Sequence, residues 1–124
     1  MAYDQHQEKQ YPKDPQTTFR AALSAVEKLG GLMVSSAPDK ARLEVKFPKT
    51  ILGKTLGERT YLSCEVRAEG EGSLAVVDAY PLDAVERKLL FGARKGVTKE
   101  MVDLFTSQMD AQLNSSNTLI AVSL

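Results

Sequence analysis

The residues of this chain that could act in catalysis are few and lie far apart. His6 is the only histidine, and the residues around it show no hydrophobic periodicity. A hydrolytic triad needs a histidine held beside a nucleophile, and a histidine in an unstructured tail is not held there. Cys64 is the only cysteine and falls on the apolar side of an alternating segment, where a thiol usually serves as a small buried hydrophobe. We therefore expect no catalytic residues of this kind, no metal site and no cofactor.

The best candidate for ligand binding is a basic stretch with glycines that leads into the last predicted helix. Residues 85–100 contain five basic and two acidic side chains, a local charge of +3 in a chain whose 16 basic and 16 acidic residues balance. Free N–H groups and the helix dipole at the start of a helix favour an anion. The residues that we assign to this anion site are Arg87, Lys88, Arg94, Lys95, Gly96 and Thr98. A solvated basic loop is the alternative.

A second candidate is a pocket near Asp78 and Tyr80. If Leu74 and Val76 point inward, strict alternation turns Asp78 toward the helices as well. A buried carboxylate needs a partner or a raised pKa and is typical of an enzyme site or a small-ligand pocket. The alternative is a strand end or a bulge that leaves Asp78 exposed. A hollow helix–sheet interface would favour the enzyme, and a filled one would favour a binding module.

The clearest element of secondary structure is a helix that begins at Pro15. Asp14 is suited to cap it, and proline is tolerated at the first helical position because its missing N–H is not needed there. Gly30 and Gly31 suit the end of this helix. Between these two ends, apolar residues repeat with helical spacing along one face: Phe19, Ala22, Leu23, Val26 and Leu29. This face needs a sheet to cover it.

Four later segments are typical of strands, and one is typical of a second helix. An apolar run at residues 32–34 precedes alternating segments at residues 42–47, 60–68 and 74–80, and residues 98–113 show helical periodicity. The predicted order is α-β-β-β-β-α. This order predicts an α+β two-layer sandwich, in which both helices cover one face of an antiparallel four-stranded sheet, or a five-stranded sheet if the C-terminus adds an edge strand.

The ends of the chain complete this prediction. Residues 1–13 are expected to form a disordered tail, residues 14–113 a single domain, and residues 114–124 a C-terminal tail or an edge strand. Pairing of residues 118–124 with a second copy would make a homodimer.

The composition limits the partners. The balanced charge gives no specific signal for nucleic acid, and no apolar run approaches the roughly 18 residues that span a membrane. Apolar residues at 51–52 and 89–91 could contact a membrane surface or a partner protein; the alternative is that they cap the open end of the core. Without a signal peptide, a cytoplasmic location is expected. We predict a small non-catalytic binding module for an anionic group or a partner protein; the alternative is an enzyme or small-ligand pocket near Asp78 and Tyr80.

Overall fold

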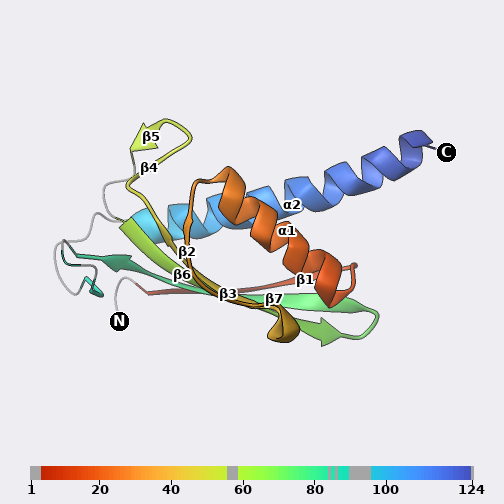
Figure 1. Cartoon of the computed structure of the whole chain (residues 1–124), viewed down its shortest axis with the longest axis horizontal. Coiled ribbons are helices and arrows are strands. Elements are labelled where there is room, and N and C mark those ends of the chain that lie inside the picture. Colours follow the sequence, from red (N-terminus) through yellow and green to blue (C-terminus); the bar gives the residue numbers. More distant parts are fainter. Residues whose placement is uncertain (1–3, 56–58, 84, 86, 90–95, 124) are drawn as a thin grey trace.

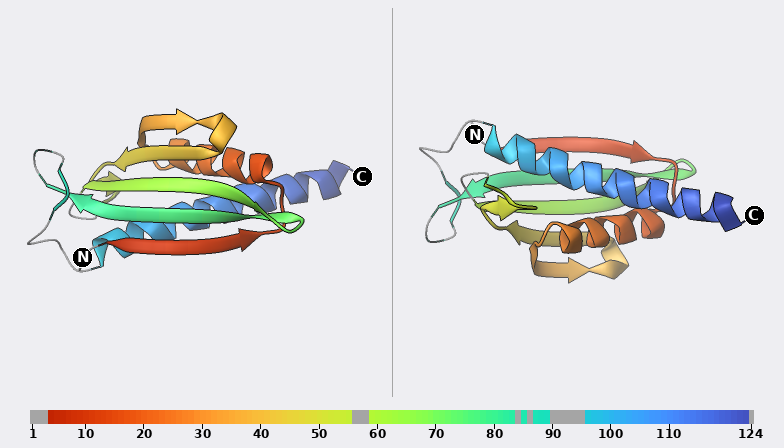
Figure 2. Two further views of the ribbon diagram at one scale, coloured as in Figure 1. Left: turned by 90° about the horizontal axis from the view of Figure 1, so that it is seen from below. Right: turned by 90° about the horizontal axis from the view of Figure 1, so that it is seen from above.

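A computed structural model of the protein describes residues 4–55, 59–83, 85, 87–89 and 96–123. Its elements, in chain order, are β1 (Gln5–Tyr11), α1 (Pro15–Lys28), β2 (Leu32–Ala37), the 3-10 turn η1 (Pro38–Lys40), β3 (Arg42–Phe47), β4 (Thr50–Ile51), β5 (Lys54–Thr55), β6 (Arg59–Glu69), β7 (Gly72–Leu82) and α2 (Val97–Ser123). Five strands form one antiparallel sheet in the order β1-β7-β6-β3-β2, and β4 and β5 form a separate short hairpin. Both helices lie on the same face of the sheet (Figures 1 and 2). The α+β class is therefore confirmed. The predicted order α-β-β-β-β-α is wrong in its first element, because the chain begins with β1, and this strand supplies the fifth strand of the sheet.

The predicted first helix and both of its caps are present. The Asp14 carboxylate accepts hydrogen bonds from the backbone N–H of Thr17, at 3.2 Å, and from its hydroxyl, at 2.6 Å. At the other end, Gly30 has a positive φ of 74°, and the N–H of Gly31 donates to the carbonyl of Val26. The left-handed Gly30 and the hydrogen bond from Gly31 are features of a Schellman motif, which satisfies the last carbonyl groups of the helix.

The interface between the helices and the sheet is filled by large apolar side chains. Its largest fully buried members include Phe19 from α1, Phe47 from β3, Leu62 from β6, and Phe105 and Met109 from α2. The rings of Phe47 and Phe105 lie 6.4 Å apart at an interplanar angle of 58°, a tilted contact that aromatic pairs favour. The core is therefore assembled from both helices and the central strands, as the apolar patterns predict.

The expectation of a disordered tail over residues 1–13 is wrong for Gln5–Tyr11, which form the edge strand β1 against β7. The segment carries no apolar periodicity because its inward-facing side chains are mostly polar. One of them, Lys9, forms an ion pair of 2.6 Å with Asp110 of α2. Backbone pairing along β7, contacts of this kind and the burial of Tyr11 in the core together order this strand.

The prediction of a C-terminal edge strand is also wrong, because residues 118–123 continue α2. Once a helix is nucleated, each further residue that is fixed gains a hydrogen bond, which lets α2 extend through residues whose β-branched side chains favour strands. Figures 1 and 2 show the last turns of α2 running beyond the sheet. The open edges of the sheet are therefore β1 and β2. In the part of the chain that is described, no helix is long and apolar enough to cross a membrane.

Candidate binding site on the outer sheet face

The alternation of β7 has the opposite phase from the one expected. Ala75, Val77 and Ala79 are 1–2% exposed and face the helices. Asp78 is exposed on the other side of the sheet, which we call the outer face, and Tyr80 is half-buried there. The predicted pocket between helices and sheet at these two residues is therefore wrong. Neither a strand end nor a bulge is involved, because β7 pairs in continuous register with both of its neighbours.

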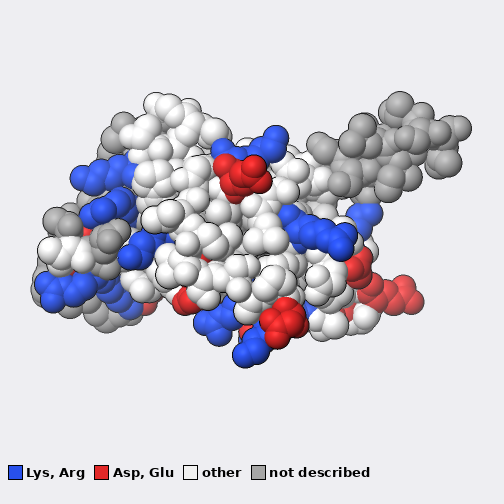
Figure 3. Space-filling view, in the orientation of Figure 1, with Lys and Arg blue, Asp and Glu red and all other residues white. Residues whose placement is uncertain are grey.

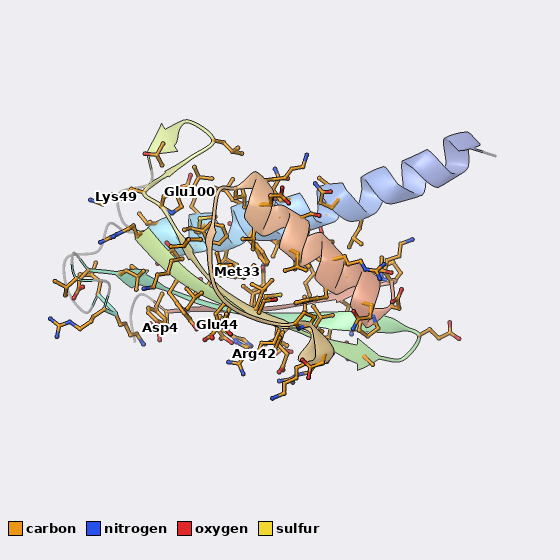
Figure 4. All side chains as sticks on the ribbon, viewed as in Figure 1. Asp4, Met33, Arg42, Glu44, Lys49 and Glu100 are labelled. Carbon is orange, nitrogen blue, oxygen red and sulfur yellow. The ribbon has the colours of Figure 1, made fainter. Side chains whose placement is uncertain are left out.

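The outer face carries a hollow of about 230 Å³. Strands β3, β6 and β7 supply its lining, which consists of Arg42, Ser63, Cys64, Glu65, Arg67, Val76 and Asp78. We call it the outer-face hollow. Figure 4 shows the side chains of Arg42 and Glu44 on the side of the sheet away from the helices. The Cys64 thiol itself is buried and its pKa is raised to about 12 by that burial, so no reactive thiolate is present at ordinary pH.

Both carboxylates that line the hollow are already paired. Glu65 accepts from Nε of Arg67 at 2.7 Å, and Oδ1 of Asp78 lies 2.6 Å from Nδ1 of His6 on β1. Their negative charge is therefore partly balanced within the protein, so the hollow does not present a free acidic cluster.

Two donors at the hollow remain without such a partner. Arg42 is an exposed side chain opposite Glu65 in the register, and Ser63 lies opposite Asp78. Among the described residues, none forms a hydrogen bond or an ion pair with the Arg42 guanidinium or the Ser63 hydroxyl. A guanidinium presents several N–H groups in a planar fork that suits a carboxylate. The hollow therefore offers unused donors to a ligand.

The neighbouring histidine is not arranged for nucleophilic catalysis. His6 Nδ1 faces Asp78, and its Nε2 lies 2.9 Å from a carboxylate oxygen of Glu8. The hydrogen bond to Asp78, followed by that to Glu8, raises the pKa of His6 above 6.5, which favours the imidazolium that donates to both. In a triad the histidine lies between serine and aspartate, whereas here Asp78 separates His6 from Ser63 in the strand order. The three side chains therefore do not form a triad.

Two tyrosines stack at the end of the same face. The rings of Tyr61 and Tyr80 lie 4.7 Å apart at an interplanar angle of 21°, and the Tyr61 hydroxyl donates to Glu44. Lys88 lies 5.2 Å from the centre of the Tyr80 ring and forms an ion pair of 2.7 Å with Asp4. Charges of both signs alternate on this face, so it lacks the uniformly basic surface that nucleic-acid binding uses.

The predicted anion site before α2 is only partly described. Lys88 is paired with Asp4, as above, and the Arg87 side chain is exposed. The backbone N–H and carbonyl of Arg87 are both bonded to Asp83. Arg94 and Lys95 lie outside the described residues. Figure 3 shows Lys and Arg side chains gathered near the end of the molecule that holds the start of α2 and the β4–β5 hairpin.

The last two residues assigned to that site have different roles. Helix α2 begins at Val97, and the carbonyl of Gly96, whose φ is 83°, accepts the N–H of Glu100 at 2.9 Å. Thr98 is only 6% exposed and lies inside the first turn. Its hydroxyl is therefore not presented to solvent, contrary to its assignment to an anion site. Ile51 is 1% exposed and belongs to the core, as the alternative in which these residues cap the core predicts, whereas Leu52 is 67% exposed.

The alternation of residues 42–47 and 60–68 is enough to place Arg42, Ser63, Glu65 and Arg67 on the solvated face, but it does not group them with Asp78. The signal that could have joined them is the composition of β7. Its alternative phase, with Ala75, Val77 and Ala79 inward, is also fully apolar. That phase places Asp78 outward, beside the polar residues of β6.

Comparisons with known proteins find similarity in fold but not in sequence. The sequence matches no protein-family model, and no curated protein matches it. The structure of protein CV1439 from Chromobacterium violaceum is similar, with a TM-score of 0.56 at 12% identity over 93% of this chain and 96% of that one. SA2116, a protein of unknown function from Staphylococcus aureus, gives a TM-score of 0.56 at 12% identity over 93% and 95%. Ara h 8.0201 gives 0.55 at 10% identity over 90% and 98%. This chain thus shares an α+β fold with proteins that are distant in sequence.

Proposed function

We propose that this protein is a small non-catalytic binding module and that the outer-face hollow takes a ligand group bearing a single carboxylate. The observation that supports this proposal most directly is the contrast in pairing at the hollow. Its carboxylates, Glu65 and Asp78, each have a cationic partner. Among the described residues, by contrast, no side chain forms a hydrogen bond or an ion pair with the Arg42 guanidinium or the Ser63 hydroxyl. The filled helix–sheet interface supports a surface site over an internal pocket.

The charges around the hollow favour a carboxylate over a phosphate. Glu65 and Asp78 line it alongside Arg42. Arg67 and His6 balance these two carboxylates only in part, so both still repel an anion bound at Arg42. The repulsion grows with the charge of the ligand, so a dianion is disfavoured relative to a monoanion. Arg42 can donate two parallel hydrogen bonds to a planar carboxylate, with Ser63 as an additional donor. The apolar side chain of Val76 provides a surface for an aliphatic group attached to that carboxylate.

The test is a titration of the isotopically labelled protein with sodium acetate, followed by the amide NMR shifts of residues in β3, β6 and β7. Sodium chloride is used to keep the ionic strength constant, because exposed charges are screened by salt. Arg42→Gln removes the fork, and Arg20→Gln on α1 is the matched control, since Arg20 is also exposed but lies on another element. We expect acetate to shift the hollow amides in the unmodified protein and in the control, and Arg42→Gln to weaken this by ~10-fold, which corresponds to the loss of about one charge-assisted bidentate contact.

Three results would contradict the proposal. Chloride alone could give the same shifts as acetate, which would indicate only general screening. Equal acetate affinity in the Arg42→Gln and Arg20→Gln variants would show that the hollow does not use its guanidinium. Phosphate binding more tightly than acetate would refute the choice of a monoanion.

A further inference from the structure

The edge strand β2 is unusually apolar for an open edge. Leu32, Met33 and Val34 are 69%, 36% and 50% exposed, and the strand contains no charged residue. Figure 3 shows an uncharged surface across the middle of the side on which β2 lies, and Figure 4 labels Met33 there. In the sheet, β2 pairs with β3 alone, so its outer backbone groups face away from the sheet. Such an edge is a template for another strand.

We propose that β2 pairs antiparallel with β2 of a second copy, so that the two sheets join across a two-fold axis. The other edge explains why this partner is favoured. Strand β1 carries His6, Glu8 and Lys9, and charged side chains on an edge oppose pairing. Pairing of β2 with β1 of another copy would also leave free edges and produce an open fibre, whereas β2–β2 pairing closes after two copies.

The segments that flank β2 carry no excess charge of one sign. Glu27 and Lys28 end helix α1 three residues before the strand, and Asp39 and Lys40 belong to the turn η1 that follows it; all four are exposed. Each segment holds one acid and one base, so neither end of β2 carries a net charge that would repel a second copy. The chain as a whole has a formal charge of zero, so no net repulsion opposes association.

The strand also limits how tight the dimer can be. Its register with β3 shifts between Met33 and Ser35, which is a β-bulge or similar irregularity. A bulge twists an edge and interrupts regular pairing. Only short stretches of β2 can therefore pair continuously, and we expect a dimer that dissociates on dilution.

The experiment is light scattering coupled to size exclusion, with the full chain loaded from about 1 mM down to about 10 μM, a range over which a weak complex dissociates. Leu32→Lys places a charge on the edge. Leu52→Lys is the matched control, because Leu52 is 67% exposed and lies outside the main sheet. We expect the unmodified protein and the control to approach twice the 13.6 kDa mass of one chain at high concentration, and Leu32→Lys to raise the dissociation constant by at least ~10-fold. Far-UV circular dichroism checks that both variants are folded.

A second measurement on the unmodified protein needs no variant. Amide hydrogen exchange of residues 32–37 should slow at high concentration, because the outer backbone groups of β2 become paired. A protein that stays monomeric at 1 mM, or exchange in β2 that is independent of concentration, would overturn the proposal. So would equal dissociation constants for Leu32→Lys and Leu52→Lys, or masses that grow beyond two copies, which would indicate open pairing. None of these outcomes depends on the carboxylate site at Arg42.

Discussion

Replacing Phe47 with alanine tests whether the helix–sheet interface is as tightly packed as the structure describes. Phe47 is 1% exposed, and its ring contacts that of Phe105 in α2. Truncation of a buried phenylalanine costs about 3–5 kcal/mol, made up of the lost transfer free energy and the cavity that remains. The aromatic contact contributes about 0.5–1.5 kcal/mol to such a site, which places the expected loss in the upper half of the range. Since a domain is stable by only about 5–15 kcal/mol, this is a large fraction of the total.

The assay is urea denaturation followed by far-UV circular dichroism, with Leu52→Ala as the control. Leu52 is 67% exposed, and a substitution at an exposed site usually changes stability by less than about 0.5 kcal/mol. The midpoint of Phe47→Ala should fall well below that of the control, with a similar dependence on urea. A loss below about 1 kcal/mol would refute the filled interface, because it would mean that the ring already borders empty space or can be replaced by rearrangement.

Three further predictions follow from particular positions. Gly31→Ala should destabilise the protein by about 1–3 kcal/mol in the same urea assay, because an added Cβ would lie 2.6–3.0 Å from three core side-chain atoms, and an unchanged midpoint would contradict this packing. NMR titration should give His6 a pKa above 6.5, which Asp78→Asn lowers. A raised pKa adds stability below the unfolded-state pKa, and this contribution should be lost as the pH rises through the raised pKa; an unshifted His6 would disprove the pairing. Replacing both Arg94 and Lys95 with alanine should leave acetate binding unchanged, whereas its loss would move the anion site to the stretch before α2.

The parts of the fold that could be predicted are those in which several local signals agree. Helix α1 combines the Asp14 cap, Pro15 at its first position, an apolar face and the Gly30–Gly31 end, and it was correct at each point. Strand β6 alternates with only one apolar side, so its buried face was also unambiguous.

The errors occurred in strands whose sequence has no apolar periodicity, or has apolar residues on both sides so that two phases are possible. Strand β1 is polar on both sides up to Tyr11, so its order depends on the open edge of β7 and on contacts to α2 that lie far away in sequence. Strand β7 has apolar residues on both sides, so periodicity alone could not choose its phase, and the choice depends on the packing of its small side chains beneath the helices. Because Asp78 belongs to β7, the location of the candidate site depended on that choice. The residues of the site could be read from the sequence, but which of them lie together depends on how the strands pair in the folded sheet.

The central claim is that a ligand binds on the outer face of the sheet and not between the helices and the sheet. Chemical-shift mapping of the unmodified protein with acetate and with longer aliphatic carboxylates tests it most directly. We predict that the largest shifts fall on Arg42, Ser63 and Asp78 and their neighbours, and that longer aliphatic chains strengthen binding through contact with Val76. Shifts concentrated on core residues such as Phe19 and Met101, which are 0–1% exposed, would show that the ligand enters the helix–sheet interface and would contradict the account.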